Sequence, residues 1–209
     1  MNVIGTALNE LYRIFSILNR DKFDNALPEP VITIYKTKGR TLGHFTVDRV
    51  WVDKNDVNNE DNSYYEINID PRWFSKRTSA EVVETLLHEM CHYRNKISGI
   101  NDCNGSNHNK KFKTLAESVG LIVEKGGSVG YGYTSLSDEL KKYIDEEIKP
   151  DDKAFEYFRT GKADKDKKPK IKKMFKYICP DCGQIAKGKA DISIRCGLCD
   201  VDMEIEDED

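Results

Sequence analysis

Five consecutive residues, His88-Glu89-Met90-Cys91-His92, carry the clearest chemistry in this sequence. On a helix, a spacing of four residues places His88 and His92 on the same face, one turn apart. Two imidazoles in that arrangement can bind one Zn²⁺ ion at about 2.0–2.1 Å each. Glu89 follows the first histidine, so its carboxylate can reach a water molecule on the metal without binding the metal itself. The pattern therefore predicts a catalytic zinc site in which Glu89 is the general base.

A catalytic zinc site needs a third protein ligand and one open coordination position. His108 follows the second histidine after fifteen residues and stands at the start of the next expected helix, from where its side chain can turn back toward the metal. The sequence therefore favours His108 as the third ligand. Glu117, on that same helix, is the carboxylate alternative, whereas His44 falls in an early strand region and is interpreted as a polar strand residue.

Four of the six cysteines form two Cys-x-x-Cys pairs separated by thirteen residues, namely Cys179, Cys182, Cys196 and Cys199. Each pair can form a tight turn that presents two thiolates, and two such turns complete a closed, structural zinc site. A redox-active dithiol is the competing interpretation, although one pair would suffice for it. The two ligand sets predict two zinc ions per chain, one catalytic and one structural.

The other two cysteines and two tyrosines are weaker candidates. Cys91 lies about 100° from His92 around the helix, so we expect a buried core thiol there, and Cys103 is expected to be a free thiol in a loop. Tyr131 and Tyr133 lie in a glycine- and tyrosine-rich segment and are candidate hydroxyl donors to the oxyanion of a peptidase reaction.

The apolar pattern along the chain predicts the helices that would hold these residues. Apolar residues recur at steps of three and four over residues 3–20, which is typical of an amphipathic helix. Thr78-Ser79-Ala80-Glu81 has the form of a capping box, and apolar positions continue that helix past the second histidine to about Ile97. A further helix is expected around Phe112, with Gly120 as its C-terminal stop.

Shorter elements are expected around these helices. The β-branched and alternating segments predict three strands, at residues 31–36, 43–52 and 64–69. The glycine- and tyrosine-rich residues 126–134 are expected to be irregular. Two short helices are expected after them, at residues 137–148 and 152–159.

Charge is distributed unevenly along the 209 residues, although the formal net charge is only -3. Residues 161–178 contain eight Lys and two Asp, whereas residues 200–209 contain seven acidic residues and no basic one. The Lys-rich residues 161–174 are interpreted as a linker between a domain at residues 1–160 and a Cys₄ module with an acidic tail at residues 175–209. No apolar stretch approaches the roughly 18 residues that span a bilayer, and the first residues lack the features of a signal peptide, so we expect a cytoplasmic protein with no membrane partner.

Together, these motifs resemble the SprT-like family of zinc metallopeptidases. The likeness rests on the helix leading into Phe23-Asp24-Asn25-Ala26-Leu27-Pro28, on the HExxH segment, on the later stretch from His108 to Phe112, and on the Cys₄ ribbon. It covers roughly residues 1–125 and 175–200. Asn109 stands where members of the family often have Gly, a difference that concerns the backbone rather than the ligands.

The resemblance implies an α+β fold of the minigluzincin type, with helices packed on a small β-sheet, followed by a small zinc ribbon. It also implies that His88, His92 and His108 bind the catalytic zinc, that Glu89 is the base, and that proteins bound or crosslinked to DNA are candidate substrates. The Lys-rich run either follows the phosphates of single-stranded DNA or is a solvated linker. The alternative function is a non-enzymatic, nucleic-acid-associated zinc protein, in which Glu89 would have no use as a base.

Overall fold

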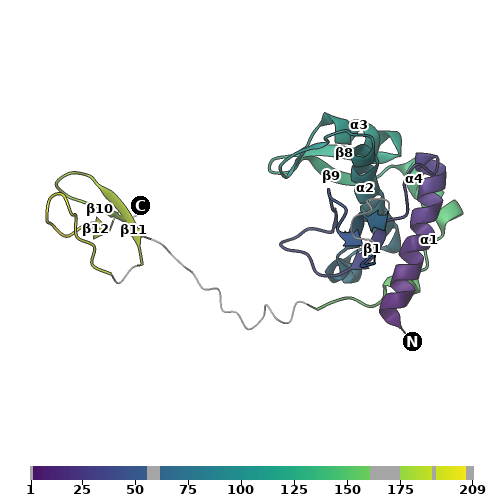
Figure 1. Ribbon diagram of the computed structural model, residues 1–209, viewed down its shortest axis with the longest axis horizontal. Coiled ribbons are helices and arrows are strands. Elements are labelled where there is room, and N and C mark those ends of the chain that lie inside the picture. Colours follow the sequence, from purple (N-terminus) through teal and green to yellow (C-terminus); the bar gives the residue numbers. More distant parts are fainter. Residues whose placement is uncertain (1, 56–61, 161–174, 190–191, 206–209) are drawn as a thin grey trace. The chain divides into compact units, whose positions relative to one another are not determined.

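The computed structural model describes residues 2–55, 62–160, 175–189 and 192–205. The chain divides into two compact units, Met1–Thr160 and Gly161–Asp209 (Figure 1). The expected Lys-rich linker at residues 161–174 and the last four acidic residues, 206–209, lie outside the described residues. Among the helices of the described part, none is long and apolar enough to cross a membrane.

The first unit opens with helix α1 (Val3–Phe23), three residues longer than its apolar pattern predicts. The Asn2 side chain accepts a hydrogen bond from the backbone of Gly5, which satisfies one of the free N–H groups of the first turn. The helix ends at Asp24, which takes the left-handed conformation with φ 53°. Its apolar face is buried against the rest of the unit.

A three-stranded sheet lies beside α1, with the order β1-β5-β2 (β1 Val31–Ile34, β5 Glu66–Ile69, β2 Gly43–Phe45). The central strand β5 pairs in parallel with β1 and antiparallel with β2. Every residue of β5 is buried, including Glu66 and Asn68 on the face opposite the main core. Strand β2 therefore lies at one edge of the sheet.

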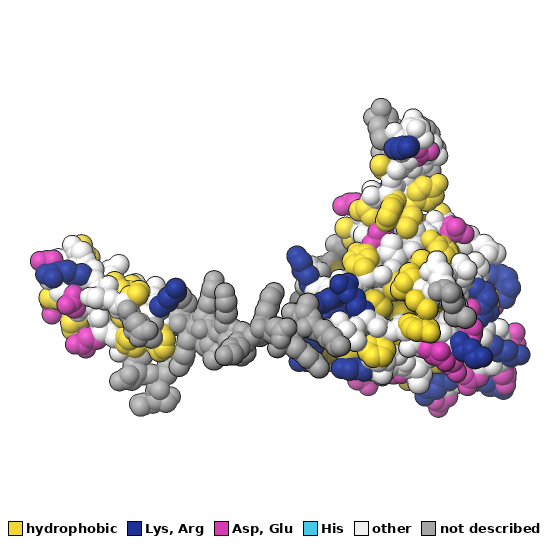
Figure 2. Space-filling view, turned by 90° about the horizontal axis from the view of Figure 1, so that it is seen from below, with side chains coloured by type: hydrophobic (Ala, Val, Ile, Leu, Met, Phe, Trp, Pro, Cys, Tyr) yellow, Lys and Arg dark blue, Asp and Glu magenta, His cyan; other side chains and the backbone are white. Residues whose placement is uncertain are grey.

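The expected strand at residues 43–52 is in fact two elements. After β2 the chain turns, and β3 (Trp51–Val52) pairs with β4 (Ser63–Tyr64) as a separate hairpin. This hairpin and its approach expose apolar side chains, namely Val47, Val50, Trp51, Val52 and Tyr64. The face of the first unit seen in Figure 2 carries apolar side chains interspersed with basic ones.

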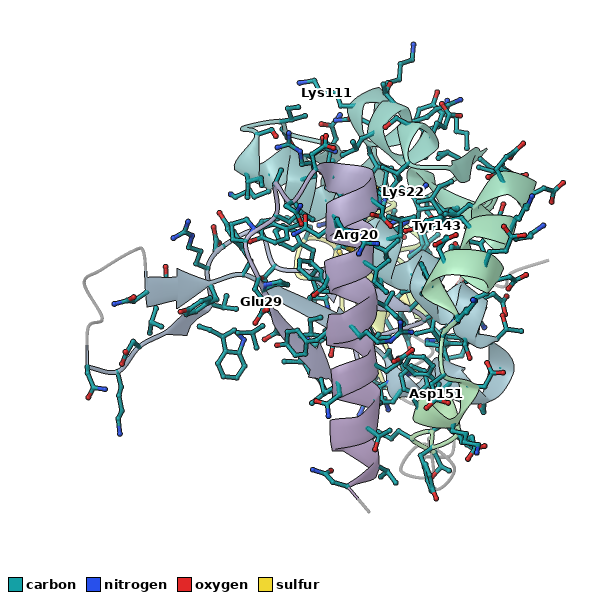
Figure 3. The ribbon with its side chains drawn as sticks, turned by 90° about the vertical axis from the view of Figure 1, so that its right-hand side faces the viewer. Arg20, Lys22, Glu29, Lys111, Tyr143 and Asp151 are labelled. Carbon is teal, nitrogen blue, oxygen red and sulfur yellow. The ribbon has the colours of Figure 1, made fainter. Side chains whose placement is uncertain are left out.

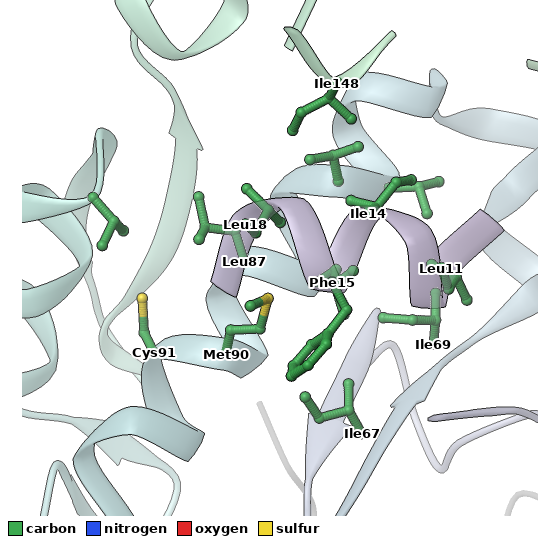
Figure 4. Close-up of a cluster of buried hydrophobic side chains, with 14 of the residues drawn as sticks. Leu11, Ile14, Phe15, Leu18, Ile67, Ile69, Leu87, Met90, Cys91 and Ile148 are labelled. Atoms are coloured by element: carbon green, nitrogen blue, oxygen red, sulfur yellow. The ribbon is translucent and has the colours of Figure 1, made fainter. Parts of the chain in front are cut away.

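Helix α2 (Ser79–Ile97) is the centre of the first unit. The predicted capping box is confirmed, because Thr78 and Glu81 exchange side-chain and backbone hydrogen bonds at its start. It contacts α1, strands β2 and β5, and the elements that follow it. Figure 4 shows Leu87 and Met90 of α2 in one buried cluster with side chains of α1 and β5. This packing holds α2 in place on several sides.

After α2 come two short strands, β6 (Cys103–Asn104) and β7 (Asn107–His108), and helix α3 (Lys110–Ser118). Asn109 caps α3, since its side chain accepts a hydrogen bond from the backbone of Lys111. The expectation of an irregular segment at residues 126–134 is wrong: the chain there forms the antiparallel pair β8 (Leu121–Gly126) and β9 (Gly130–Leu136). The four strands are ordered β6-β7-β9-β8.

The last part of the first unit returns to α1. It contains α4 (Asp138–Tyr143), a π-helical turn η3 (Ile144–Ile148) and a 3₁₀ turn η4 (Asp152–Phe155). The Tyr143 hydroxyl donates to Asp21 at 2.6 Å, and its ring lies 4.4 Å from the Lys22 ammonium (Figure 3). Further along α1, the backbone of Asp151 donates to Glu10 at 2.8 Å. These contacts join the end of the unit to its beginning.

The second unit contains a three-stranded antiparallel sheet of β10 (Phe175–Ile178), β11 (Ile185–Gly188) and β12 (Glu204–Ile205), with β10 in the middle. The hairpin of β10 and β11 encloses the first cysteine pair. The beginning of the expected acidic tail belongs to this sheet, because Met203 is buried and Glu204 pairs with Ile178. Of the expected acidic tail, residues 206–209 lie outside the described residues.

Candidate metal centre

Three imidazoles from two segments converge in the first unit. His88 and His92 project from the same face of α2, and His108 comes from β7. The Nε2 atom of His108 lies 3.2 Å from that of His88 and 3.0 Å from that of His92. Tetrahedral nitrogen ligands at the usual zinc distance are about 3.3 Å apart. The three nitrogens therefore fit a zinc ion and leave a fourth position open.

The other ring nitrogen of each histidine has a hydrogen-bond partner. The Nδ1 atoms of His88, His92 and His108 lie 3.2, 2.8 and 3.1 Å from Thr134 Oγ1, Asp102 Oδ2 and the carbonyl oxygen of Val129. Such partners fix the orientation and tautomer of a metal-binding imidazole. All three rings therefore present Nε2 to the same point.

An aromatic ring forms the floor beneath the three histidines. Phe112 of α3 is fully buried, and its ring centroid lies 4.7, 4.6 and 4.6 Å from those of His88, His92 and His108. This explains why the sequence places a phenylalanine one turn after the third histidine. A buried apolar floor excludes water from one side of the site and keeps the rings from turning away.

Asp102 is the strongest partner of the cluster. It accepts hydrogen bonds from His92 at 2.8 Å and from Asn95 at 3.0 Å. Burial by itself raises the pKa of Asp102, but its hydrogen bond with His92 and that residue's charge lower it below the ordinary value. Burial also lowers the pKa of His88 well below the usual range, with His92 and His108 adding to the effect. A neutral His88 is the form that can bind a metal ion.

Glu89 sits beside the cluster and is almost entirely buried. Burial raises the pKa of Glu89 to about 7, against the opposing effects of His92 and of a hydrogen bond from the backbone of Phe45. Strand β2 approaches closely here, since a Cβ on Gly43 would lie 3.3 Å from Cγ of Glu89 and 2.9 Å from a backbone oxygen of β5. Glycine at this position thus lets the strand cover the carboxylate.

The cluster and Glu89 line a cleft of about 1200 Å³. Strand β2 and the residues before it form one wall, and the loop after α2 together with β9 forms the other. Tyr133, 57% exposed, is part of the second wall. Tyr131 is not among the lining residues; its ring lies near the ammonium groups of Lys113 and Lys125. The Tyr133 ring lies against Gly126, on the face of β9 opposite Thr134, so neither tyrosine hydroxyl is placed at the histidines.

The remaining candidates from the sequence are Glu117, His44, Cys91 and Cys103, and only Cys103 belongs to a group of potential ligands with one of the histidines. Glu117 forms an ion pair with Lys113 at 3.5 Å and is not in any group of potential ligands found among the described residues. His44 does lie in a strand, where its Nε2 atom is 3.1 Å from the Tyr35 hydroxyl. Cys91 is fully buried in the core, as expected. Cys103 lies next to His92 and Asp102, which the sequence did not suggest.

Several residues of the site have no signal in the sequence. Asp102, Val129 and Thr134 hold the histidines, yet the first lies in the loop after α2 and the other two in the β8–β9 hairpin, with no spacing rule relative to the histidines. Gly132 is equally necessary, because a Cβ there would lie 2.6 Å from Nδ1 of His108. The glycine- and tyrosine-rich composition marked the segment as unusual but did not reveal its role.

The second unit brings together the other ligand set. The sulfur atoms of Cys179, Cys182, Cys196 and Cys199 lie within 4.8 Å of one another, and those of Cys182 and Cys196 are 3.6 Å apart. Tetrahedral thiolates at the usual zinc distance are about 3.8 Å apart. Backbone N–H groups of Cys199 and Leu198 lower the pKa of Cys196 to about 7, which favours a thiolate. Four sulfurs fill the coordination of a zinc ion, so this arrangement suits a structural site.

The model of the SprT-like family matches residues 11–129, more than half of the chain, including both histidines of α2, Glu89 and His108. No curated protein and no solved structure matches the sequence. The second unit lies outside the matched residues. Because this match covers more than half of the sequence, the chain belongs to the SprT-like family.

Proposed function

We propose that this protein is a zinc-dependent metallopeptidase whose first unit has a minigluzincin-like fold and whose second unit is a structural zinc ribbon. The observation that carries the proposal is the convergence of three imidazoles, with Nε2 of His108 3.2 Å from that of His88 and 3.0 Å from that of His92, beside the buried carboxylate of Glu89. Three nitrogen ligands with an open fourth position are typical of catalytic zinc. Zinc bound there would lower the pKa of a water molecule and polarise a peptide carbonyl.

Glu89 has the position and the proton affinity of a general base. Its pKa of about 7 means that it can accept a proton from the attacking water and release it to the leaving amine near neutral pH. The backbone of Phe45 holds the carboxylate in place.

The edge strand β2 supports a polypeptide substrate. Its pairing with β5 uses one edge of the strand, and the other edge faces the cleft. Backbone groups on that edge can pair with an extended peptide, which binds a main chain with little regard to its side chains. This arrangement favours unfolded or loop segments of proteins as substrates. The Lys-rich run at residues 161–174 of the sequence supports proteins bound or crosslinked to DNA as the source of those segments.

The test is cleavage of an unstructured protein such as casein by the zinc-loaded full chain. Parent protein should cleave it, a chelator should stop cleavage, and Glu89→Gln should lower the rate by at least about 100-fold because only the base is lost. The variant should keep its zinc, and Glu124→Gln, an exposed glutamate on β8, is the matched control. Equal cleavage by Glu89→Gln and the parent would contradict the mechanism. Absence of cleavage by any form would favour the non-enzymatic alternative.

A further inference from the structure

Helix α2 presents a third polar residue on the face of its two histidines. Glu84 precedes His88 by four residues, so Glu84, His88 and His92 follow one another at successive turns. Glu84 is 7% exposed, and its carboxylate does not contact the histidines directly in the described structure. Instead, Thr134 of β9 lies between them: its hydroxyl donates to Glu84 Oε1 at 2.8 Å and is 3.2 Å from Nδ1 of His88.

The direction of these hydrogen bonds decides the tautomer of His88. A threonine hydroxyl has one proton, and Thr134 gives it to the acceptor-only carboxylate of Glu84. Toward His88 the hydroxyl can therefore only accept, so Nδ1 of His88 must carry the proton. Nε2 is then left with its lone pair, and it lies 3.2 Å from Nε2 of His108.

Arg77 fixes the carboxylate of Glu84, at which this series of hydrogen bonds begins. Its guanidinium donates to Glu84 Oε2 at 2.8 Å and to the carbonyl oxygen of Glu81 at 2.8 Å. The two oxygens of Glu84 are thus divided, one for Arg77 and one for Thr134. Burial raises the pKa of Glu84, while Thr134 and Arg77 oppose that rise.

We propose that Glu84 and Thr134 form a positioning relay that holds His88 in its metal-binding tautomer, with Arg77 orienting the relay. His92 has a direct carboxylate partner in Asp102, whereas His88 has a carboxylate partner only through a hydroxyl. The inference rests on the proposed zinc site, not on peptidase activity. Loss of a residue that orients a metal-binding histidine typically weakens metal affinity about 10–100-fold.

The first experiment replaces the hydroxyl. Zinc affinity of the full chain is measured by dialysis against zinc buffers, with Thr134→Val, Thr134→Ser and the surface control Thr114→Val. Thr134→Val should weaken binding of one zinc ion by about 10–100-fold, and Thr134→Ser, which keeps the hydroxyl, should stay within a few-fold of the parent. Equal affinity of the Val and Ser variants would overturn the proposal.

The second experiment reverses the hydrogen bonds without changing the shape of the side chain. In Glu84→Gln the amide oxygen should face Arg77, so the NH₂ group faces Thr134 and the hydroxyl proton is free to be donated to Nδ1 of His88. That bond favours a proton on Nε2, where the metal ligand should be. Glu84→Gln should therefore bind zinc at least as weakly as Thr134→Val, and ¹⁵N NMR of the metal-free imidazole should show the proton moved from Nδ1 to Nε2. Parent-like affinity and an unmoved proton would exclude the relay.

His88→Ala separates failure of the relay from failure of the site. If His88→Ala loses one zinc ion while both relay variants keep it at parent affinity, the relay is wrong and the zinc site stands. If His88→Ala keeps both ions, the zinc site itself is wrong, and the relay with it. Thermal unfolding of the metal-free variants, compared with the two control variants Thr114→Val and Glu124→Gln, excludes general destabilisation as the cause.

Discussion

In each of the three clustered histidines the two ring nitrogens have different contacts: Nε2 faces the other histidines, and Nδ1 has a hydrogen-bond partner. Each histidine gives Nε2 to the shared point, whereas Nδ1 binds a partner of a different kind: a hydroxyl, a carboxylate or a backbone carbonyl. The HExxH spacing predicts the two ligands on the helix, because helical geometry alone places them together. The Nδ1 partners could not be predicted, since they depend on how distant segments pack.

His108→Ala is expected to lower the zinc content of the full chain from two ions to about one. The two histidines of α2 provide too few ligands for a stable zinc site, and the cysteine cluster lies in the other unit. Zinc is measured by elemental analysis after dialysis, with His44→Ala as the matched control because His44 is in none of the groups of potential ligands among the described residues. Two ions retained by His108→Ala would remove it as a ligand.

At the level of elements, the helices of the first unit could be predicted and the strands only in part. Helices α1 and α2 follow from local signals, namely an apolar period and a capping box, which are written in adjacent residues. The pair β8 and β9 could not be predicted, because its glycines are required by contacts with His108 rather than by a turn pattern. Gly130 has φ 59°, and a Cβ there would lie 2.4 Å from the backbone oxygen of His108.

Gly132→Ala tests the contact between β9 and the third ligand. The added Cβ would lie 2.6 Å from Nδ1 and 2.9 Å from Cε1 of His108, so the imidazole must move away from the other two. Zinc affinity of the first unit should fall by about 10-fold or more. Gly127→Ala is the control on the same hairpin, because nothing lies within 4 Å of its Cβ. The same affinity for both variants would mean that β9 does not hold His108 in place.

Across the whole molecule, the two units differ in the size of the apolar core that they form without a metal ion. The first unit has a continuous apolar core from α1 to η4, whereas the buried hydrophobic side chains in the described part of the second are Tyr177, Cys179, Cys196 and Met203. Two of these four are cysteines. A core this small does not stabilise a fold by itself, so a metal ion bound by the four cysteines would supply much of the free energy of folding.

Replacing Cys179 and Cys182 with serine should therefore unfold the second unit and leave the first intact. Circular dichroism should show loss of the β10–β12 signal, and zinc content should fall to about one ion per chain. Casein cleavage should continue, because the histidine site lies in the other unit. Loss of cleavage in this variant would show that the units are not independent.

The final prediction concerns DNA and the Lys-rich residues 161–174, whose role rests on sequence. If these lysines contact phosphates, binding of single-stranded DNA should weaken steeply with salt, because each contact releases a counterion. Replacing Lys167, Lys168, Lys170 and Lys172 with glutamine should make the plot of log affinity against log salt less steep. The magnitude of its negative slope should fall by about 3, at about 0.7 per contact. The same change at four lysines of the first unit, Lys110, Lys111, Lys141 and Lys142, should leave the slope near the parent value.

Removing only residues 206–209 should tighten binding, since their carboxylates compete for the lysines while β12 stays intact. Fluorescence anisotropy over a salt series measures the affinity of each variant for single-stranded DNA. Equal slopes for the two quadruple variants would mean that the Lys-rich run is a plain linker. Free proteins would then be the substrates to test.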